Sequence, residues 1–300
     1  MRTQMTPRGT LAVERSRAMD YITLTKPELT FLSVLTALAG YYLGAGGELS
    51  GFGLMHTLVG TAMVGGGSGA LNQYIERGYD ARMRRTENRP LPSGRITPVE
   101  ALLFGLILSC GGLLYLGFCV NPLTASLASA TCVTYLFLYT PLKRLTPLST
   151  LIGAIPGALP PVMGWTAATN EISSGACILF GILFFWQMPH FLSLAWMYRK
   201  DYARAGYRLL AVVDEGGGRT AVQALLHICL LIPVSLLLVA WEGAGMIYGV
   251  SALVLGGVFL LFSLTLLARR SSGAARRLFF ASLMYLPALM AAMVLDRILR

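Results

Sequence analysis

The chain consists of long apolar runs separated by short polar stretches. A helix needs roughly 20 apolar residues to cross the hydrocarbon core of a bilayer. Nine runs approach or reach that length: 28–46, 51–75, 101–119, 123–141, 148–168, 175–198, 221–241, 245–268 and 278–295. Pro156, Pro160 and Pro161 interrupt the fifth run, which membrane helices tolerate when neighbouring helices satisfy the freed backbone groups. The pattern predicts an all-α, multi-pass transmembrane helix bundle of nine helices.

The positively charged residues lie in alternate loops between the apolar runs. Of the 24 Lys and Arg residues, 22 lie in the N-terminal segment or after the second, fourth, sixth and eighth runs. The opposite loops contain none, and only Arg297 and Arg300 lie at the other end. Cytoplasmic loops carry an excess of Lys and Arg. We therefore expect residues 1–27 to form a cytoplasmic N-terminal tail, residues 28–300 to form a single transmembrane domain, and the C-terminus to lie outside.

Composition supports a membrane protein and argues against a nucleic-acid partner. Only 13% of residues are charged and 55% are hydrophobic, whereas a soluble domain carries about 25% charged residues. The net charge of +10 is spread between apolar segments, which favours contact with a membrane surface. The two longest cytoplasmic loops, about 76–100 and 199–220, hold most of the charge of both signs. Loops of that length in a compact protein are usually functional or disordered, and these two are too patterned to be linkers, so we look for chemistry there.

An acidic stripe ends the second predicted helix. Asn72, Glu76 and Asp80 stand four residues apart and therefore share one helix face. Each charge at the centre of a membrane costs on the order of 2.5–3.5 kcal/mol, so a compensating ligand is expected. Mg²⁺ binds carboxylate oxygens together with substrate phosphates. The arginines in 82–95 could donate paired hydrogen bonds to the remaining oxygens of a diphosphate. Equally, the stripe could belong to an ordinary cytoplasmic loop whose carboxylates pair with Arg.

Two further cytoplasmic segments carry similar groups. Asp201 follows the sixth predicted helix, flanked by Lys200 and Arg204, and Lys143 and Arg144 follow the fourth. These side chains and the stripe are expected at one cytoplasmic mouth of the bundle. The aromatic residues nearby, among them Tyr74, Tyr79, Phe191 and Tyr198, could stabilise a carbocation or serve only as membrane packing.

Five segments carry a family resemblance. They are LTKPELT (24–30), RTENRPLPSGR (85–95), YTPLKRLTP (139–147), PGALPPVMGW (156–165) and WQMPHF…KDYARAGY (186–207). The chain resembles the UbiA-type intramembrane prenyltransferases from about Leu24 to Val213, and more specifically the protohaem IX farnesyltransferase (haem O synthase) branch. That superfamily carries an NxxxDxxxD-like motif after helix 2, in which Glu76 takes the middle position here. Its quinone-directed members carry DxxxD after helix 6, where this chain has Ala205 and leaves Asp201 alone.

The resemblance implies an enzyme that transfers a farnesyl group from farnesyl diphosphate to haem B, giving haem O for haem-copper oxidases. It implies Mg²⁺ held by Asn72, Glu76, Asp80 and Asp201. It implies neutralisation of the leaving group by Arg85, Arg89, Lys143, Lys200 and Arg204, with further ligand contacts from Asn88, Arg144, Tyr198 and His190. The last is either a ligand of the haem iron or a satisfied polar residue of the bundle. The implied setting is a bacterial plasma (inner) membrane, with the lipid bilayer and a downstream haem-modifying enzyme or oxidase assembly factor as partners.

Two other functions stay open. One is prenylation of a quinone precursor such as 4-hydroxybenzoate, against which Ala205 and the DYARAG segment (201–206) argue. The other is a transporter or binding protein for haem or an anionic lipid, which would need neither Mg²⁺ nor diphosphate release. An acidic stripe is hard to explain in a carrier of anions.

Overall fold

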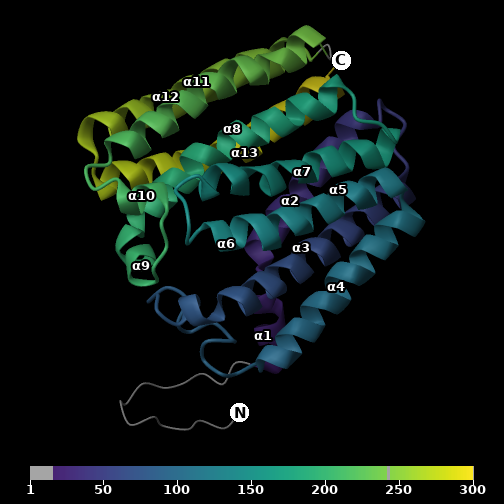
Figure 1. Cartoon of the computed structure of the whole chain (residues 1–300). Helices are drawn as coiled ribbons and strands as arrows, with labels where there is room; N and C mark the ends of the chain where they lie inside the picture. Colours follow the sequence, from purple (N-terminus) through teal and green to yellow (C-terminus); the bar gives the residue numbers. More distant parts are fainter. Residues whose placement is uncertain (1–15, 242–243, 300) are drawn as a thin grey trace.

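The computed structural model describes residues 16–241 and 244–299, and every regular element in that part of the chain is a helix (Figure 1). The elements are α1 (Arg17–Leu24), α2 (Pro27–Gly44), α3 (Gly51–Asp80), α4 (Pro98–Cys119), α5 (Pro122–Val133), the π-helix η1 (Thr134–Tyr139), α6 (Thr140–Leu142), α7 (Ser149–Thr169), α8 (Ser174–Met197), α9 (Arg199–Arg204), α10 (Leu210–Val213), α11 (Gly218–Trp241), α12 (Met246–Arg269) and α13 (Ser272–Ile298).

Seven helical segments in the described part of the chain are long and apolar enough to cross a membrane. They are α4, the continuous α5–η1–α6 segment, α7, α8, α11, α12 and α13. Helices α2 and α3 are not among them, and their polar side chains include Ser33, Thr36 and Thr61. Those three side chains line an interior cavity. The all-helical multi-pass bundle is confirmed, while nine crossings and the cytoplasmic N-terminus stay predictions.

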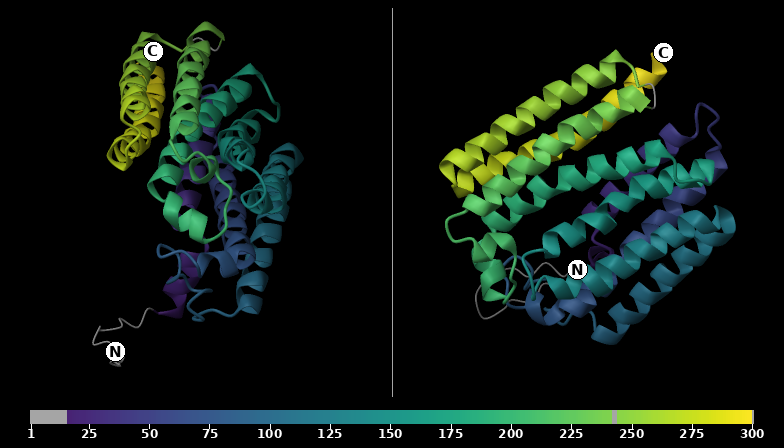
Figure 2. Two further views of the ribbon diagram at one scale, coloured as in Figure 1. Left: turned by 60° about the vertical axis from the view of Figure 1, so that its left-hand side comes forward. Right: turned by 45° about the horizontal axis from the view of Figure 1, so that its top comes forward.

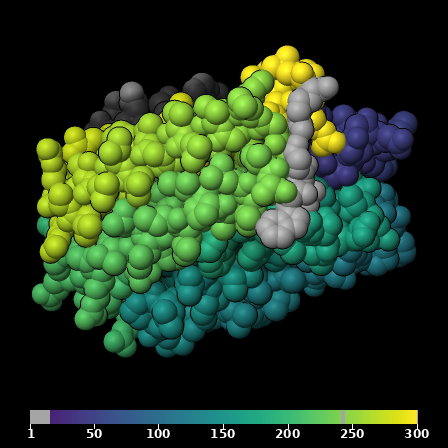
Figure 3. All heavy atoms as spheres, turned by 90° about the horizontal axis from the view of Figure 1, so that it is seen from above, coloured from purple at the N-terminus to yellow at the C-terminus, as the bar shows by residue number. Residues whose placement is uncertain are grey.

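The long helices pack side by side in a slanted bundle (Figure 2). Helix α3 packs between α4 and α2, α2 packs on α7, and α7 packs on α8. Helix α8 contacts α11 and α13, which both contact α12. The short helices α1, α9 and α10 lie at one end of the bundle, and the C-terminus lies at the other (Figure 1). Helices α11 and α12 cover one side of the molecule (Figure 3), where Val250, Leu253, Val254 and Leu261 are exposed, as expected of a lipid-facing surface.

Helices α2 and α7 approach so closely that glycine is required at their contact. A Cβ added to Gly40 would lie 1.9 Å from the carbonyl oxygen of Pro161, and one added to Gly164 would lie 1.9 Å from that of Ala37. No side chain fits at such a distance, so the two glycines set the spacing of the helix pair. Small residues at such contacts let membrane helices pack backbone to backbone.

The segment expected as an N-terminal tail contains a docked helix. The tail prediction for residues 1–15 lies outside the described residues, whereas residues 17–24 form α1. The buried carboxylate of Asp20 accepts a hydrogen bond from Arg95 Nε at 3.0 Å. The Gln73 amide on α3 donates to the carbonyls of Thr23 and Leu24 at 2.9 and 3.1 Å. The turn between α1 and α2 is therefore fixed to α3.

A π-helical turn connects α5 to α6. The N–H of Thr140 bonds to the carbonyl of Tyr135, five residues earlier, instead of four. Pro141 follows at once; its ring has no N–H and crowds the carbonyl four residues before it, which a wider turn accommodates. The part of this helix that follows the turn contacts α3, where the Asn72 amide donates to Thr140 Oγ1.

Candidate active site

A cavity opens between α2, α3, α5, η1, α7 and α8. Its volume, including the open mouth, is about 1100 Å³. Most of its wall is apolar, with Leu29, Val64, Met163 and Leu183 among the lining residues. Lys26 also lines it and connects it to the acidic stripe of α3. A largely apolar cavity with a few convergent polar groups is the usual form of a small-molecule site.

The cation nearest the cavity is Lys26. Its Nζ donates to Asn72 Oδ1 and, at 3.2 Å, to the hydroxyl of Tyr135. The Asn72 amide in turn donates to Thr140 Oγ1 at 2.8 Å. Burial of Lys26, together with the positive charge of Arg89, lowers the pKa of its amine to about 7. Among the described residues, Lys26 has an amide and a phenol as hydrogen-bond partners and forms no ion pair with a carboxylate, which leaves its amine available to an anionic ligand.

Sequence reasoning did not select Lys26 as a site residue. Its backbone adopts a left-handed conformation with φ of 50°, directly before Pro27 begins α2. A non-glycine residue in that region is uncommon and is held there by the surrounding structure. The signal available in the sequence was the Lys-Pro pair inside LTKPELT.

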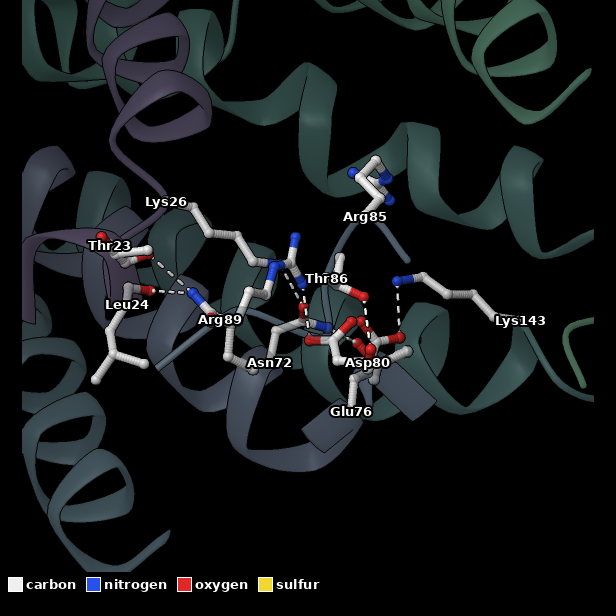
Figure 4. A network of polar contacts seen from close by, with 12 residues as sticks. Thr23, Leu24, Lys26, Asn72, Glu76, Asp80, Arg85, Thr86, Arg89 and Lys143 are labelled. Atoms are coloured by element: carbon white, nitrogen blue, oxygen red, sulfur yellow. Dashed lines mark hydrogen bonds and ion pairs between the residues drawn. The ribbon is translucent and has the colours of Figure 1, made fainter. Parts of the chain in front are cut away.

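The two carboxylates of the stripe are each paired with a cation (Figure 4). Glu76 Oε1 accepts hydrogen bonds from Lys143 Nζ at 2.9 Å and from the Tyr207 hydroxyl at 3.0 Å. Asp80 Oδ2 accepts one from Arg89 at 2.7 Å. Both carboxylates are more than nine-tenths buried. Burial alone would lower the pKa of Lys143, but Glu76 beside it more than reverses this and raises that pKa well above its usual value.

The oxygen atoms of the stripe fit a Mg²⁺ ion that the protein coordinates only in part. Within residues 16–241 and 244–299, no three His, Cys, Asp or Glu side chains converge as a metal cage. The stripe offers two carboxylates and one amide oxygen. Mg²⁺ usually takes one or two protein carboxylates and completes its shell with waters and substrate phosphates. The residues therefore fit an ion that arrives with a phosphorylated ligand and is only partly held by protein.

Asp201 pairs with a cation of its own loop rather than with the cations that pair with the stripe. Its carboxylate pairs with Arg204 at 3.2 Å, and both residues line a second pocket together with Lys200. Arg85 contacts this region: its guanidinium is 5.3 Å from the ring centre of Tyr198 and donates to the Tyr202 hydroxyl at 3.4 Å. The predicted site residues thus form two groups at one end of the bundle.

The remaining predicted contacts lie around these groups. Arg144 donates to the Tyr79 hydroxyl at 2.7 Å, and the Tyr79 ring stacks on that of Tyr207 with centroids 5.7 Å apart. Asn88 is exposed, and its backbone carbonyl accepts a hydrogen bond from Arg95 at 3.0 Å. Arg144 therefore supports the wall beside Glu76, whereas Asn88 faces outward on the loop.

The neighbours of His190 bear on which of its ring nitrogens carries the proton. His190 lines the cavity, and its Nδ1 lies 2.8 Å from Ser282 Oγ. The Ser282 hydroxyl also lies within hydrogen-bond distance of the carbonyl of Phe279, and when it donates there, its oxygen accepts from His190 Nδ1. The ring proton then sits on Nδ1 and the lone pair on Nε2, the arrangement expected of a metal-ligating histidine whose second nitrogen is anchored. Phe279 stacks on the same ring at 4.8 Å.

The chain is similar to one protein family and to relatives that share one name. The chain matches the UbiA prenyltransferase family over residues 33–286. A protein of Salinibacter ruber named protoheme IX farnesyltransferase is 49% identical over 277 residues, covering 92% of this chain and 98% of the relative. A protein of Koribacter versatilis with the same name is 46% identical over 301 residues, covering 96% and 97%.

Solved structures share the fold. A digeranylgeranylglyceryl phosphate synthase superposes with a TM-score of 0.79 at 17% identity, covering 93% of this chain and 98% of that one. A UbiA homologue from Archaeoglobus fulgidus bound to GPP and Mg²⁺ superposes with a TM-score of 0.63 at 15% identity, covering 92% and 99%. At these identities the likeness concerns the fold alone.

Proposed function

The chain belongs to the UbiA prenyltransferase family, and we propose that this prenyltransferase attaches the farnesyl group of farnesyl diphosphate to a vinyl group of haem B, giving haem O. Relatives named protoheme IX farnesyltransferase are 41–49% identical over more than nine-tenths of the chain. The observation that carries the proposal is the set of buried cation–carboxylate pairs at the edge of an apolar cavity. That combination suits a substrate with a charged head and an apolar tail.

The reaction balances as follows. The bond between farnesyl C1 and the diphosphate oxygen breaks, and the bonding electron pair leaves with diphosphate. The vinyl π-electrons form a new C–C bond to C1, which leaves a cation on the carbon next to the porphyrin. Water adds its oxygen there and one proton is released, so the vinyl group becomes a hydroxyalkyl group that carries the farnesyl chain.

The chain's own residues stabilise the leaving group. In this proposal Asn72, Glu76 and Asp80 hold Mg²⁺, which when bound neutralises charge on the departing diphosphate. Lys26 and Lys143, with Arg85 and Arg89 from the loop, bind the remaining oxygens. Each well-placed donor in such a dry site contributes about 3 kcal/mol to the transition state. Whether Asp201, Lys200 and Arg204 also act on the diphosphate stays a prediction.

The cavity would hold the apolar parts of the two substrates. Its wall of Leu29, Val64, Met163 and Leu183 would enclose the farnesyl chain and exclude water from the allylic cation. Tyr135 and Tyr139 stack near Lys143, with ring centroids 5.9 Å apart, and would present their ring faces to that cation. His190 Nε2 would contact the haem iron and position the ring.

The test is mass spectrometry of haems extracted after incubating the purified protein with haem B, farnesyl diphosphate and Mg²⁺. We expect a haem heavier by one farnesyl group plus one hydroxyl group, absent when EDTA is added. Parallel incubations replace haem B with 4-hydroxybenzoate. A prenylated benzoate without haem O, or neither product from folded protein, would contradict the proposal. In a bacterial plasma membrane the product would supply haem-copper oxidases.

A further inference from the structure

The proposed reaction needs one water molecule inside a cavity whose wall is mostly apolar. That water must not reach the allylic cation, yet it must reach the cation that then forms on the carbon next to the porphyrin. A buried water is held only where polar atoms bind it. Three hydroxyls of the wall already donate to backbone carbonyls of their own helices: those of Ser33, Thr36 and Thr131, at 3.2, 3.0 and 2.9 Å. A polar atom of the wall that has no partner is a better place for the water.

Gln187 of α8 carries such an atom. Its side chain is buried and lines the cavity, and its Nε2 donates to the carbonyl oxygen of Ala154 in α7 at 2.7 Å. A carbonyl oxygen can only accept, so the nitrogen of the amide must be the atom beside Ala154 and the oxygen must be the other one. Among the described residues, no donor is bonded to Gln187 Oε1. The amide is thus fixed through its nitrogen while its oxygen keeps its full accepting capacity.

Two glycines of α7 place this oxygen close to the ring of Tyr139. A Cβ added to Gly157 would lie 2.1 Å from Gln187 Oε1, and one added to Gly153 would lie 2.5 Å from the Tyr139 ring. Both glycines line the cavity. They are four residues apart, so they share one face of α7 and differ by about 6 Å along its axis. The free amide oxygen therefore lies about one helical turn from a ring that faces the cation in the proposed reaction.

We propose that Gln187 Oε1 accepts a hydrogen bond from the water that captures the cation next to the porphyrin, an inference that rests on the proposed function. The hydrogen bond turns a lone pair of the water oxygen toward the cationic carbon, and that pair forms the new C–O bond. The protonated alcohol then gives its extra proton to the released diphosphate, because an amide is too weak a base to keep it. Without a water held in place, the cation instead loses a proton from the neighbouring CH₂ group and becomes an alkene.

The hydroxyl of Thr61 is the rival position for this water. Thr61 Oγ1 lines the cavity and is also without a hydrogen-bond partner among the described residues. However, Thr61 precedes Asn72 by eleven residues of α3, which is about 16 Å along the helix. The reacting end of the farnesyl chain lies where its diphosphate binds, at the Asn72 end. Thr61 is therefore beside the far end of the chain, and Gln187 is the better candidate.

The experiment measures how the cation divides between two products. Purified variants are incubated with haem B, farnesyl diphosphate and Mg²⁺, and mass spectrometry gives the ratio of the alkene, lighter by one water, to haem O. Diphosphate release is measured in parallel. Gln187→Met removes the amide at similar size, Gly157→Ala displaces its oxygen, and Gln187→Glu restores a carbonyl oxygen with an O–H donor when protonated. The control is Gln223→Met, because Gln223 is exposed on α11, which contributes no residue to the cavity wall.

We expect Gln187→Met to raise the ratio of alkene to haem O about tenfold, the effect of losing one hydrogen bond to the attacking water. Gly157→Ala should shift the ratio in the same direction, whereas Gln187→Glu and Gln223→Met should keep the parent's ratio. Diphosphate release by Gln187→Met should fall far less than haem O formation, because the farnesyl C–O bond breaks before water is needed. A purely structural role would slow both equally and leave the ratio unchanged.

An unchanged ratio in Gln187→Met, or a shift caused by Thr61→Val instead, would overturn the inference. If Gln187→Met does not fold, Gly157→Ala decides the question, because it keeps the glutamine and moves only its oxygen. Failure of the proposed function is a different result, since the parent protein would then make no haem O at all. A parent that makes haem O at a ratio insensitive to both positions would refute the role of Gln187 alone.

Discussion

Replacing Lys143 by Met removes the charge that faces Glu76 and keeps most of the apolar stem. The two side chains are 13% and 8% exposed, and Nζ lies 2.9 Å from Oε1. Removing one partner of a buried ion pair costs about 3–5 kcal/mol, because the other charge remains buried and unpaired. Tyr207 still donates one hydrogen bond to Glu76, so we expect a loss near the lower limit, about 3 kcal/mol of unfolding free energy.

The reverse variant and the double variant separate stability from catalysis. Glu76→Gln leaves Lys143 charged and unpaired, so it should also destabilise the protein. Lys143→Met combined with Glu76→Gln leaves no buried charge at this position and should recover most of the loss, with a coupling energy of about 2 kcal/mol. Haem O formation should fall by about 10²–10³ for Lys143→Met, the effect of removing one preorganised donor, and the double variant should stay inactive.

The assays are chemical unfolding in detergent, followed by circular dichroism, and haem O formation at saturating substrates. Because the pKa of Lys143 is raised well above its usual value, the stability that the charge of Lys143 contributes is complete below about pH 10.4, the unfolded-state value, as long as Glu76 stays ionised. It is lost only as pH rises through the higher folded-state pKa, so the destabilisation by Lys143→Met should be constant between pH 7 and 9. A double variant as unstable as Lys143→Met, or one that retains activity, would refute the reasoning.

Three further substitutions test separate features. Asp80→Asn should abolish haem O formation with an unchanged circular dichroism spectrum; retained turnover would remove Asp80 from the metal site. Gly164→Ala should lower the unfolding temperature in detergent, because the new Cβ meets a carbonyl at 1.9 Å, whereas Gly257→Ala, in open space, should not; equal effects would contradict close packing. His190→Ala should change the haem absorption spectrum and His227→Ala should not; identical spectra would exclude iron ligation by His190.

Part of the site follows directly from the sequence. The spacing of Asn72, Glu76 and Asp80 places them on one helix face whatever the tertiary structure, and the structure has them on one buried face of α3. Their partners could be assigned only to the same end of the bundle. That Lys143 meets Glu76 depends on the π-turn before it, and such a wide turn has no reliable sequence pattern.

Other features depend on tertiary contacts that periodicity does not reveal. Lys26 enters the site because a left-handed backbone directs its chain inward, held by the bonds of Gln73 to the α1–α2 turn. Asp201 lies on a short helix, α9, whose place is set by loop geometry, so its position relative to the stripe was not predictable. Helix α1 has too few residues to be stable alone and forms where Asp20 meets Arg95.

The π-turn between α5 and α6 rotates the residues that follow it about the axis of one continuous helix. An α-helix advances about 100° per residue, so one extra residue in a turn rotates everything after it by that amount. Before the turn, Thr124 faces Thr166 of α7; after it, Thr140 faces Asn72 of α3. Deleting one residue between 134 and 139 would therefore keep the helix and its apolar length. It would swing Lys143 about 100° away from Glu76, making catalysis far more sensitive than membrane insertion to the number of residues here.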